Sequence, residues 1–98
     1  MKKEFFLSAL ALVAQKTGVS EQIIQSLTRT EEVLDARALV VYCCRKYGLS
    51  NKDIRLLFER NGHHFTQKMY DLCLSRKQFS NYYSALCASI CKQLGISE

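Results

Sequence analysis

The sequence contains no proline in its 98 residues, so no position forces a break in a helix. Apolar residues make up 48% of the chain, and there are only four glycines. Leucine, alanine, lysine, glutamine and arginine dominate, which favours helix over strand. No glycine- and serine-rich stretch indicates a linker or disorder. The sequence therefore predicts one all-α domain over residues 1–98, with about six helices around a single core.

Start and stop signals place the first half of these helices. Ser20 is a candidate N-cap for a short helix. Glu31–Tyr47 carries its acids first and its bases last, and Gly48 follows, which favours a helix whose charges agree with its macrodipole. Because Val40–Cys44 is apolar nearly all round, we expect this helix to be the central and most buried one.

A helix-turn-helix pattern follows at about residues 50–74. Ser50-Asn-Lys-Asp53 is a variant of the capping box and marks a helix start. Arg60-Asn-Gly62 breaks that helix, and a second one resumes near His64.

The last helix is predicted to begin at a second capping box, Ser75-Arg-Lys-Gln78. Its apolar stripe, at a spacing of three to four residues, runs from Phe79 to Leu94. We expect the stripe to pack on the core, and the helix also offers an interface for a homodimer or a protein partner.

The first fourteen residues resemble a secretory signal, because two lysines precede an apolar run that ends in small residues. Glu4 opposes that interpretation, and Gly18 closes the segment as a helix-terminating glycine would. We favour a structural first helix. The run is too short to span a bilayer.

The charge is concentrated in one part of the chain. Residues 45–77 hold eight lysines and arginines against three acids, which accounts for the whole net charge of +5. An excess of this kind on one helical unit is the electrostatic signature of a surface that meets a polyphosphate. The alternative is an ordinary solvated, lysine-rich helix surface.

Five cysteines, an odd number without a C-x-x-C pair, do not form a disulfide framework. They fall in apolar helical stretches, so we expect buried thiols and a reducing, cytoplasmic setting. Cys87 and Cys91 share one helical face, and His63 and His64 are adjacent, so a metal site is conceivable. The spacing lacks the two close pairs of a closed zinc site. We therefore predict no metal and no cofactor.

In a DNA-binding helix-turn-helix, the second helix lies in the major groove and presents the outward residues of its first turns to the bases. That outward set is His63, His64, Gln67 and Lys68, with Asp71 beyond them. Candidates for phosphate contacts lie on the preceding helix and at helix ends: Arg45, Lys46, Lys52, Arg55, Arg76 and Lys77.

Signatures of enzymes are missing from the sequence. There is no glycine-rich phosphate loop, no H-E-x-x-H and no G-x-S-x-G. His63 and His64 have only Cys73, far along the chain, as a potential nucleophile. We therefore expect a protein that is not an enzyme.

Residues from Val13 to about Leu72 resemble the C-terminal DNA-binding domain of the bacterial replication initiator DnaA. The elements of that family pattern occur here in order and at matching spacing over about sixty residues: Gly18-Val19-Ser20, Ile24-Gln25-Ser26, Arg29, Asp35-Ala36-Arg37, Tyr42, Arg45, Gly48-Leu49-Ser50, Ile54 and Phe58. The resemblance implies a helix-turn-helix of the DnaA and Trp-repressor type.

The resemblance also implies roles for particular residues. It adds Thr66 to the groove-facing set and Arg29, in the family's basic joint, to the DNA-contacting set; Arg37 joins the phosphate contacts. The family's Arg-Asp-His-Thr-Thr motif at the recognition helix is replaced here by Asn61-Gly-His-His-Phe-Thr66. We therefore expect DNA specificity that has diverged from that of the initiator.

Taken together, these patterns predict a stand-alone module that binds duplex DNA, in replication or transcription control in a bacterial cytoplasm. No membrane and no small-molecule substrate are expected. The alternative is an adaptor that keeps the fold but binds a protein through its first or last helix.

Overall fold

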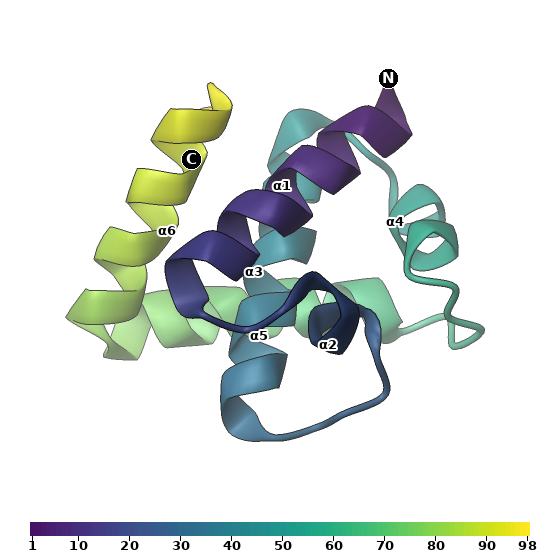
Figure 1. The fold of residues 1–98 in the computed structure, drawn as a ribbon, viewed down its shortest axis with the longest axis horizontal. Coiled ribbons are helices and arrows are strands. Elements are labelled where there is room, and N and C mark those ends of the chain that lie inside the picture. Colours follow the sequence, from purple (N-terminus) through teal and green to yellow (C-terminus); the bar gives the residue numbers. More distant parts are fainter.

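The computed structural model describes all 98 residues and contains six α-helices and no strand. The helices are α1 (Lys2–Thr17), α2 (Glu21–Gln25), α3 (Glu31–Tyr47), α4 (Asn51–Leu57), α5 (Phe65–Phe79) and α6 (Asn81–Leu94). In Figure 1, α1 crosses in front of α3, α5 runs crosswise behind them, and α4 and α6 stand on opposite sides. The prediction of an all-α fold with six helices is confirmed.

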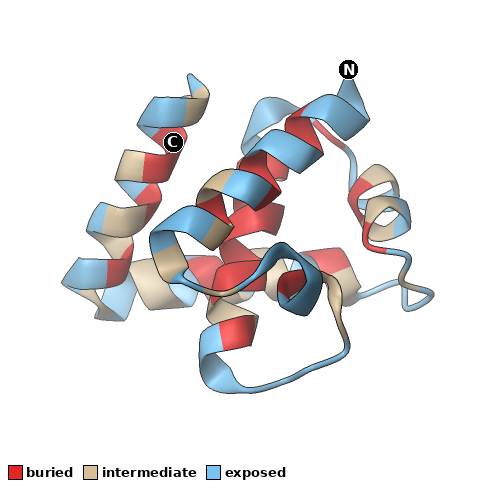
Figure 2. Cartoon of the chain, in the orientation of Figure 1, coloured by how far each residue is buried: buried red, intermediate tan, exposed pale blue.

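Helix α3 is the centre of the molecule, as the sequence predicted. Ten of its 17 residues are buried, and it packs against α1, α2, α4 and α5. Figure 2 shows buried positions on α3 and on the inner face of α1. Each fully buried aliphatic or aromatic side chain contributes about 1.5–3 kcal/mol, so α3 supplies much of the hydrophobic free energy of folding.

The predicted signals at the ends of α3 and α4 work as expected. Gly48 ends α3 in the left-handed region at φ 115°, where a side chain would be strained. The Ser50 hydroxyl then accepts a hydrogen bond from the Asp53 backbone N–H at 3.1 Å and caps α4. On either side of this cap, Leu49 and Ile54 are buried.

The predicted start of the last helix is wrong. The capping box at Ser75 lies inside α5, which continues to Phe79. The break falls at Ser80, whose backbone is extended and whose hydroxyl accepts from the Tyr83 N–H at 3.1 Å. Arginine, lysine and glutamine after Ser75 are good helix formers, so nothing there stops α5.

Because α6 begins at Asn81 and not near Ser75, only part of the predicted apolar stripe is buried. Tyr83, Cys87, Ile90 and Cys91 are buried, as an inward stripe requires. Phe79, however, is 79% exposed and Tyr82 is 75% exposed. These two side chains stand out at the corner between α5 and α6.

The apolar run at the N-terminus belongs to the core. Helix α1 buries Phe5, Phe6, Ala9, Leu10 and Val13. The expectation of a structural first helix is confirmed. None of the helices is long and apolar enough to cross a membrane.

Candidate nucleic-acid interface

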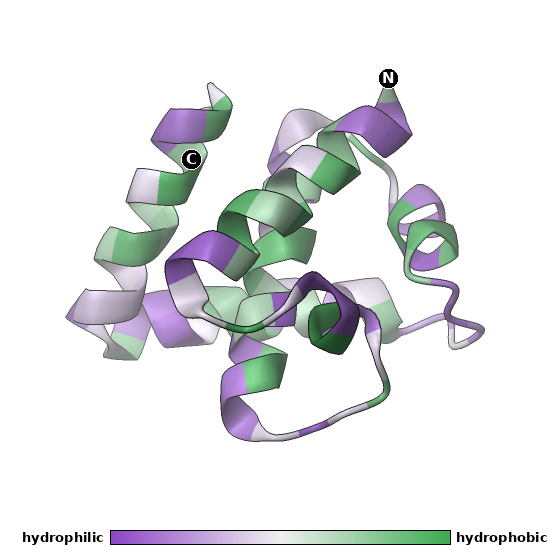
Figure 3. Ribbon diagram, viewed as in Figure 1, coloured by the Kyte–Doolittle hydropathy of each residue, from purple (hydrophilic) through white to green (hydrophobic).

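Helices α4 and α5 are joined by residues 58–64, a longer connection than the three or four residues of a typical helix-turn-helix. Phe58 and Phe65 anchor its two ends, with ring centroids 5.3 Å apart. Between them, Glu59 adopts φ 56°, which reverses the chain. Figure 3 shows this connection as a hydrophilic segment. It is thus a polar loop clamped to the core at both ends.

A basic hollow of about 480 Å³ lies between this loop, the first turns of α5 and the joint before α3. Its lining includes six basic side chains: Arg29, Arg37, Arg60, His63, His64 and Lys68. No carboxylate lines it. The hollow therefore concentrates positive potential at the start of α5.

Arg37 is a structural residue of this region, which corrects the prediction that it contacts phosphate. It is only 2% exposed, and its Nε donates to the Ile24 carbonyl at 2.6 Å. Its Nη2 donates to the carbonyls of Ser26 at 2.7 Å and Thr28 at 3.0 Å. Arg37 therefore fixes the joint between α2 and α3 from the inside.

Arg60 was not among the predicted site residues, yet it forms the wall of the hollow. Its Nη2 donates to the Ser26 carbonyl at 2.6 Å, and its guanidinium lies 5.1 Å from the centre of the Phe65 ring. Its Nε is buried without a hydrogen-bond partner. In the sequence, Arg60 stands next to Asn61-Gly62, a position that indicates only a helix break.

Arg29, Arg37 and Arg60 form a cluster of like charges with no acidic partner. Burial lowers the pKa of Arg37 to about 10, and repulsion from Arg60 and Arg29 adds to the effect. Burial, with repulsion from Arg29, also lowers the pKa of Arg60. Backbone carbonyls stabilise the Arg37 and Arg60 guanidiniums, but no carboxylate of the chain offsets the repulsion among the three positive charges.

Most of the predicted groove-facing residues reach the surface together. His63, His64, Gln67 and Lys68 are exposed, and all except Gln67 line the hollow. Gln67 lies outside it, where its amide donates to Asp71 at 2.9 Å.

Thr66 is the exception, and its predicted groove-facing role is wrong. It is 1% exposed, and its hydroxyl donates to the Asn51 carbonyl at 3.0 Å. This bond joins the starts of α4 and α5. Because successive helical positions turn by about 100°, Thr66 points inward when Gln67 and Lys68 point outward.

The predicted phosphate contacts divide into two locations. Arg29 lies in the hollow, whereas Arg45, Lys52 and Arg55 lie outside it on α3 and α4. Arg45 donates to the Asn51 side chain at 2.7 Å and stacks on Tyr70 at 4.5 Å. None of these four cations forms an ion pair within the chain, so their charges stay available to a ligand.

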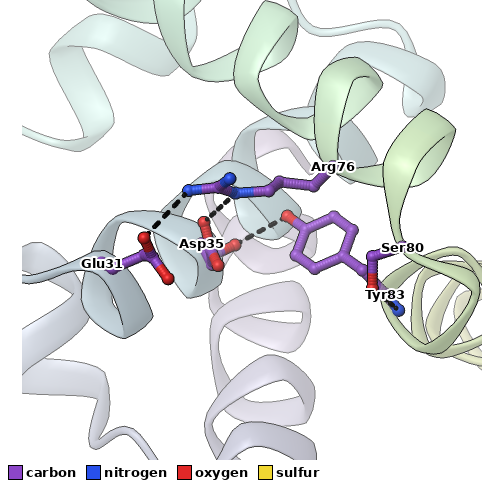
Figure 4. A network of polar contacts seen from close by, with 5 residues as sticks. All are labelled: Glu31, Asp35, Arg76, Ser80 and Tyr83. Carbon is purple, nitrogen blue, oxygen red and sulfur yellow. Dashed lines mark hydrogen bonds and ion pairs between the residues drawn. The ribbon is translucent and has the colours of Figure 1, made fainter.

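Arg76 and Lys77, two other basic residues of the stretch 45–77, form ion pairs within the chain. Figure 4 shows Arg76 bridging to Asp35 at 2.9 Å and to Glu31 at 3.7 Å, with the Tyr83 hydroxyl donating to the Asp35 backbone carbonyl at 2.8 Å. Lys77 pairs with Glu98 at 2.6 Å. These residues join α3, α5 and α6, which removes them from the candidate interface.

All five thiols are free and buried, as the sequence predicted. Burial raises the pKa of Cys44 to about 12, so this thiol stays protonated at neutral pH.

Comparison with protein-family models, curated proteins and solved structures found no match to this chain. The fold and the site define an all-α, six-helix protein with a basic hollow at the start of α5.

Proposed function

We propose that this chain is a duplex-DNA-binding module in which the start of α5 enters the major groove. The observation that carries the proposal is the arginine cluster of Arg29, Arg37 and Arg60, which has no acidic partner. Buried or half-buried charges are normally paired with an acidic group, and this cluster has none within the chain. A backbone phosphate supplies both the negative charge and the acceptor oxygens.

A duplex fits this surface better than a free phosphate does. The unpaired cations are not confined to the hollow: Arg55 on α4 donates to the backbone carbonyl of Arg60 at 3.5 Å, and Lys52 lies about one turn earlier on α4, so the cations extend beyond the size of one anion. In the proposed complex, Arg29, Arg60 and the α4 cations hold phosphates and set the register. His63, His64 and Lys68 face base edges, where Lys68 can donate to guanine acceptors.

The sequence supports the same function through its resemblance to the DnaA C-terminal domain. The altered recognition motif and the engagement of Gln67 with Asp71 point to a site different from that of the initiator. Five free thiols agree with a cytoplasmic setting.

The first test is fluorescence anisotropy of a labelled random duplex across a salt series. Phosphate contacts make log affinity fall linearly with log salt, with a slope of about −0.9 per phosphate neutralised. Lys68→Glu should abolish binding at low salt, because the reversed charge repels the backbone. The matched control is Lys92→Glu, an exposed lysine on α6 that should leave binding unchanged.

A second candidate function is a protein-binding adaptor, and the exposed aromatic pair favours it. Phe79 and Tyr82 stand out at the corner of α5 and α6, and Tyr82 borders a hollow of about 330 Å³ lined by Glu31, Glu32 and Asp35. Wild-type protein that fails to bind the duplex even at low salt would rule out the DNA proposal and leave this candidate.

A further inference from the structure

Four of the five thiols gather where α3, α5 and α6 meet, away from the basic hollow. Cys87 and Cys91 lie one turn apart on α6, and both are buried. Cys43 of α3 lies beside Cys91, and Cys73 of α5 lies beside Cys87. Cys44, the neighbour of Cys43 in the sequence, is also buried, but it forms no hydrogen bond with another thiol. The grouping therefore depends on how the helices pack and is not visible in the sequence spacing.

The chain after α6 brings a carboxylate to this cluster. Gly95 ends α6 in the left-handed region at φ 73°, and the Ile96 N–H bonds back to the Cys91 carbonyl at 3.0 Å. The chain therefore folds back along α6. The sulfur atoms of Cys87 and Cys91 and a carboxylate oxygen of Glu98 lie within 4.8 Å of one another.

We propose that Cys87, Cys91 and Glu98 form a three-ligand binding site for a thiophilic divalent metal ion of the zinc class, with the fourth tetrahedral position left to a water molecule. Zinc binds cysteine sulfur at about 2.3 Å and carboxylate oxygen at about 2.0–2.2 Å, so ligand atoms of a tetrahedral site lie about 3.5–3.8 Å apart. The three groups need only small side-chain movements to reach that spacing. The i, i+4 cysteines provide two ligands from one rigid helix.

The charges around the cluster also suit a divalent ion. Two thiolates and a carboxylate carry three negative charges, which a divalent ion and Lys77 would balance. Lys77 Nζ lies 2.6 Å from one Glu98 oxygen, and the second oxygen stays available to a metal. Lys77 thereby orients the carboxylate over the thiols, as residues that hydrogen-bond to metal ligands do in other metal sites.

The test is a titration of the purified, reduced protein with Co²⁺, followed by displacement with Zn²⁺. Binding through thiolates gives an intense sulfur-to-cobalt charge-transfer absorption, which a carboxylate-only or surface site does not give. We expect one equivalent of Co²⁺ to bind, Zn²⁺ to bleach the band, and Zn²⁺ to raise the unfolding temperature.

Variants distinguish the site from adventitious binding. Cys87→Ser and Cys91→Ser should abolish the charge-transfer band. Glu98→Gln, a substitution near the surface that spares the core, should weaken Co²⁺ binding by about 10- to 100-fold. The matched control is Cys44→Ser, which removes an equally buried thiol and should leave the band unchanged. Absence of the band in the wild type, equal loss in Cys44→Ser, or full affinity in Glu98→Gln would each overturn the proposal.

Discussion

The Arg37 guanidinium donates hydrogen bonds to backbone carbonyls of its own chain, and the first prediction concerns their contribution to stability. Arg37→Met keeps the apolar stem of the side chain but leaves the carbonyls of Ile24 and Thr28 without their donor, whereas the Ser26 carbonyl keeps its hydrogen bond from Arg60. An unsatisfied buried acceptor costs about 1–3 kcal/mol, so we expect a loss of about 3 kcal/mol in the free energy of unfolding. Urea denaturation followed by circular dichroism measures it.

The control for this prediction is Lys3→Met, which replaces an exposed cation on α1 and should change the free energy of unfolding by less than about 0.5 kcal/mol. If Arg37→Met were as stable as this control, the carbonyls would have other partners and the structural role of Arg37 would be refuted.

The site residues that were predicted wrongly share one physical cause. In the sequence, Arg37 and Arg29 are equivalent basic residues, and Thr66 and Lys68 both stand in the first turn of α5. The packing of α2 onto α3 decides that Arg37 points inward, and the contact between α4 and α5 covers the face of α5 that holds Thr66. The exposure of Lys68 was predictable because outward positions of an amphipathic helix follow from its periodicity, and His63 and His64 are exposed because they lie in the polar loop before α5. Arg60 was not, since its role depends on a loop conformation.

At the scale of the helix, Ser80 gives a prediction that separates two similar sequence signals. Ser80→Ala removes the hydroxyl that caps α6 and should lower the free energy of unfolding by about 1 kcal/mol. Ser75→Ala, at the capping box that lies inside α5, should be neutral or slightly stabilising because alanine is the better helix former. Thermal and urea unfolding of both variants make the comparison. A larger loss in Ser75→Ala would contradict the observed helix boundary.

Helix boundaries were predictable where several signals agree and not where two signals compete. Glu31–Tyr47 has ordered charges, a buried stripe and Gly48, and its observed bounds match the prediction. Ser75 and Ser80 each have a hydroxyl that can cap a helix by accepting a hydrogen bond from the backbone N–H three residues later. The choice between them depends on how far α5 can run along α3, which is a tertiary property.

The ion pair between α1 and α4 predicts a pH-dependent difference in stability. The Lys2 ammonium donates a hydrogen bond to the Asp53 carboxylate at 2.9 Å. This bond, together with a hydrogen bond between Asp53 and Ser50, lowers the pKa of Asp53 below its usual value. Since the folded-state pKa is the lower one, the stabilisation is present above the unfolded-state pKa and is lost as the pH falls through the folded-state pKa.

Lys2→Met should therefore lower the unfolding temperature at pH 7 and converge with the wild type at acid pH. The neighbouring Lys3→Met is the control, because Lys3 forms no ion pair. Thermal unfolding at pH 7, 5, 4 and 3 tests the pattern. A constant difference between Lys2→Met and the wild type at every pH would show that Lys2 stabilises α1 by packing and not by charge.

For the whole molecule, the unpaired arginine cluster implies a conflict between stability and binding. Arg29 is exposed and makes no hydrogen bond within the chain, yet it repels Arg37 and Arg60. Arg29→Gln should therefore stabilise the free protein by a few tenths of a kcal/mol while it weakens duplex binding and reduces the salt slope by about one. Lys92→Gln, far from the cluster, should change neither quantity. If Arg29→Gln destabilised the free protein and left binding intact, Arg29 would be a structural residue and the cluster would not be a phosphate site.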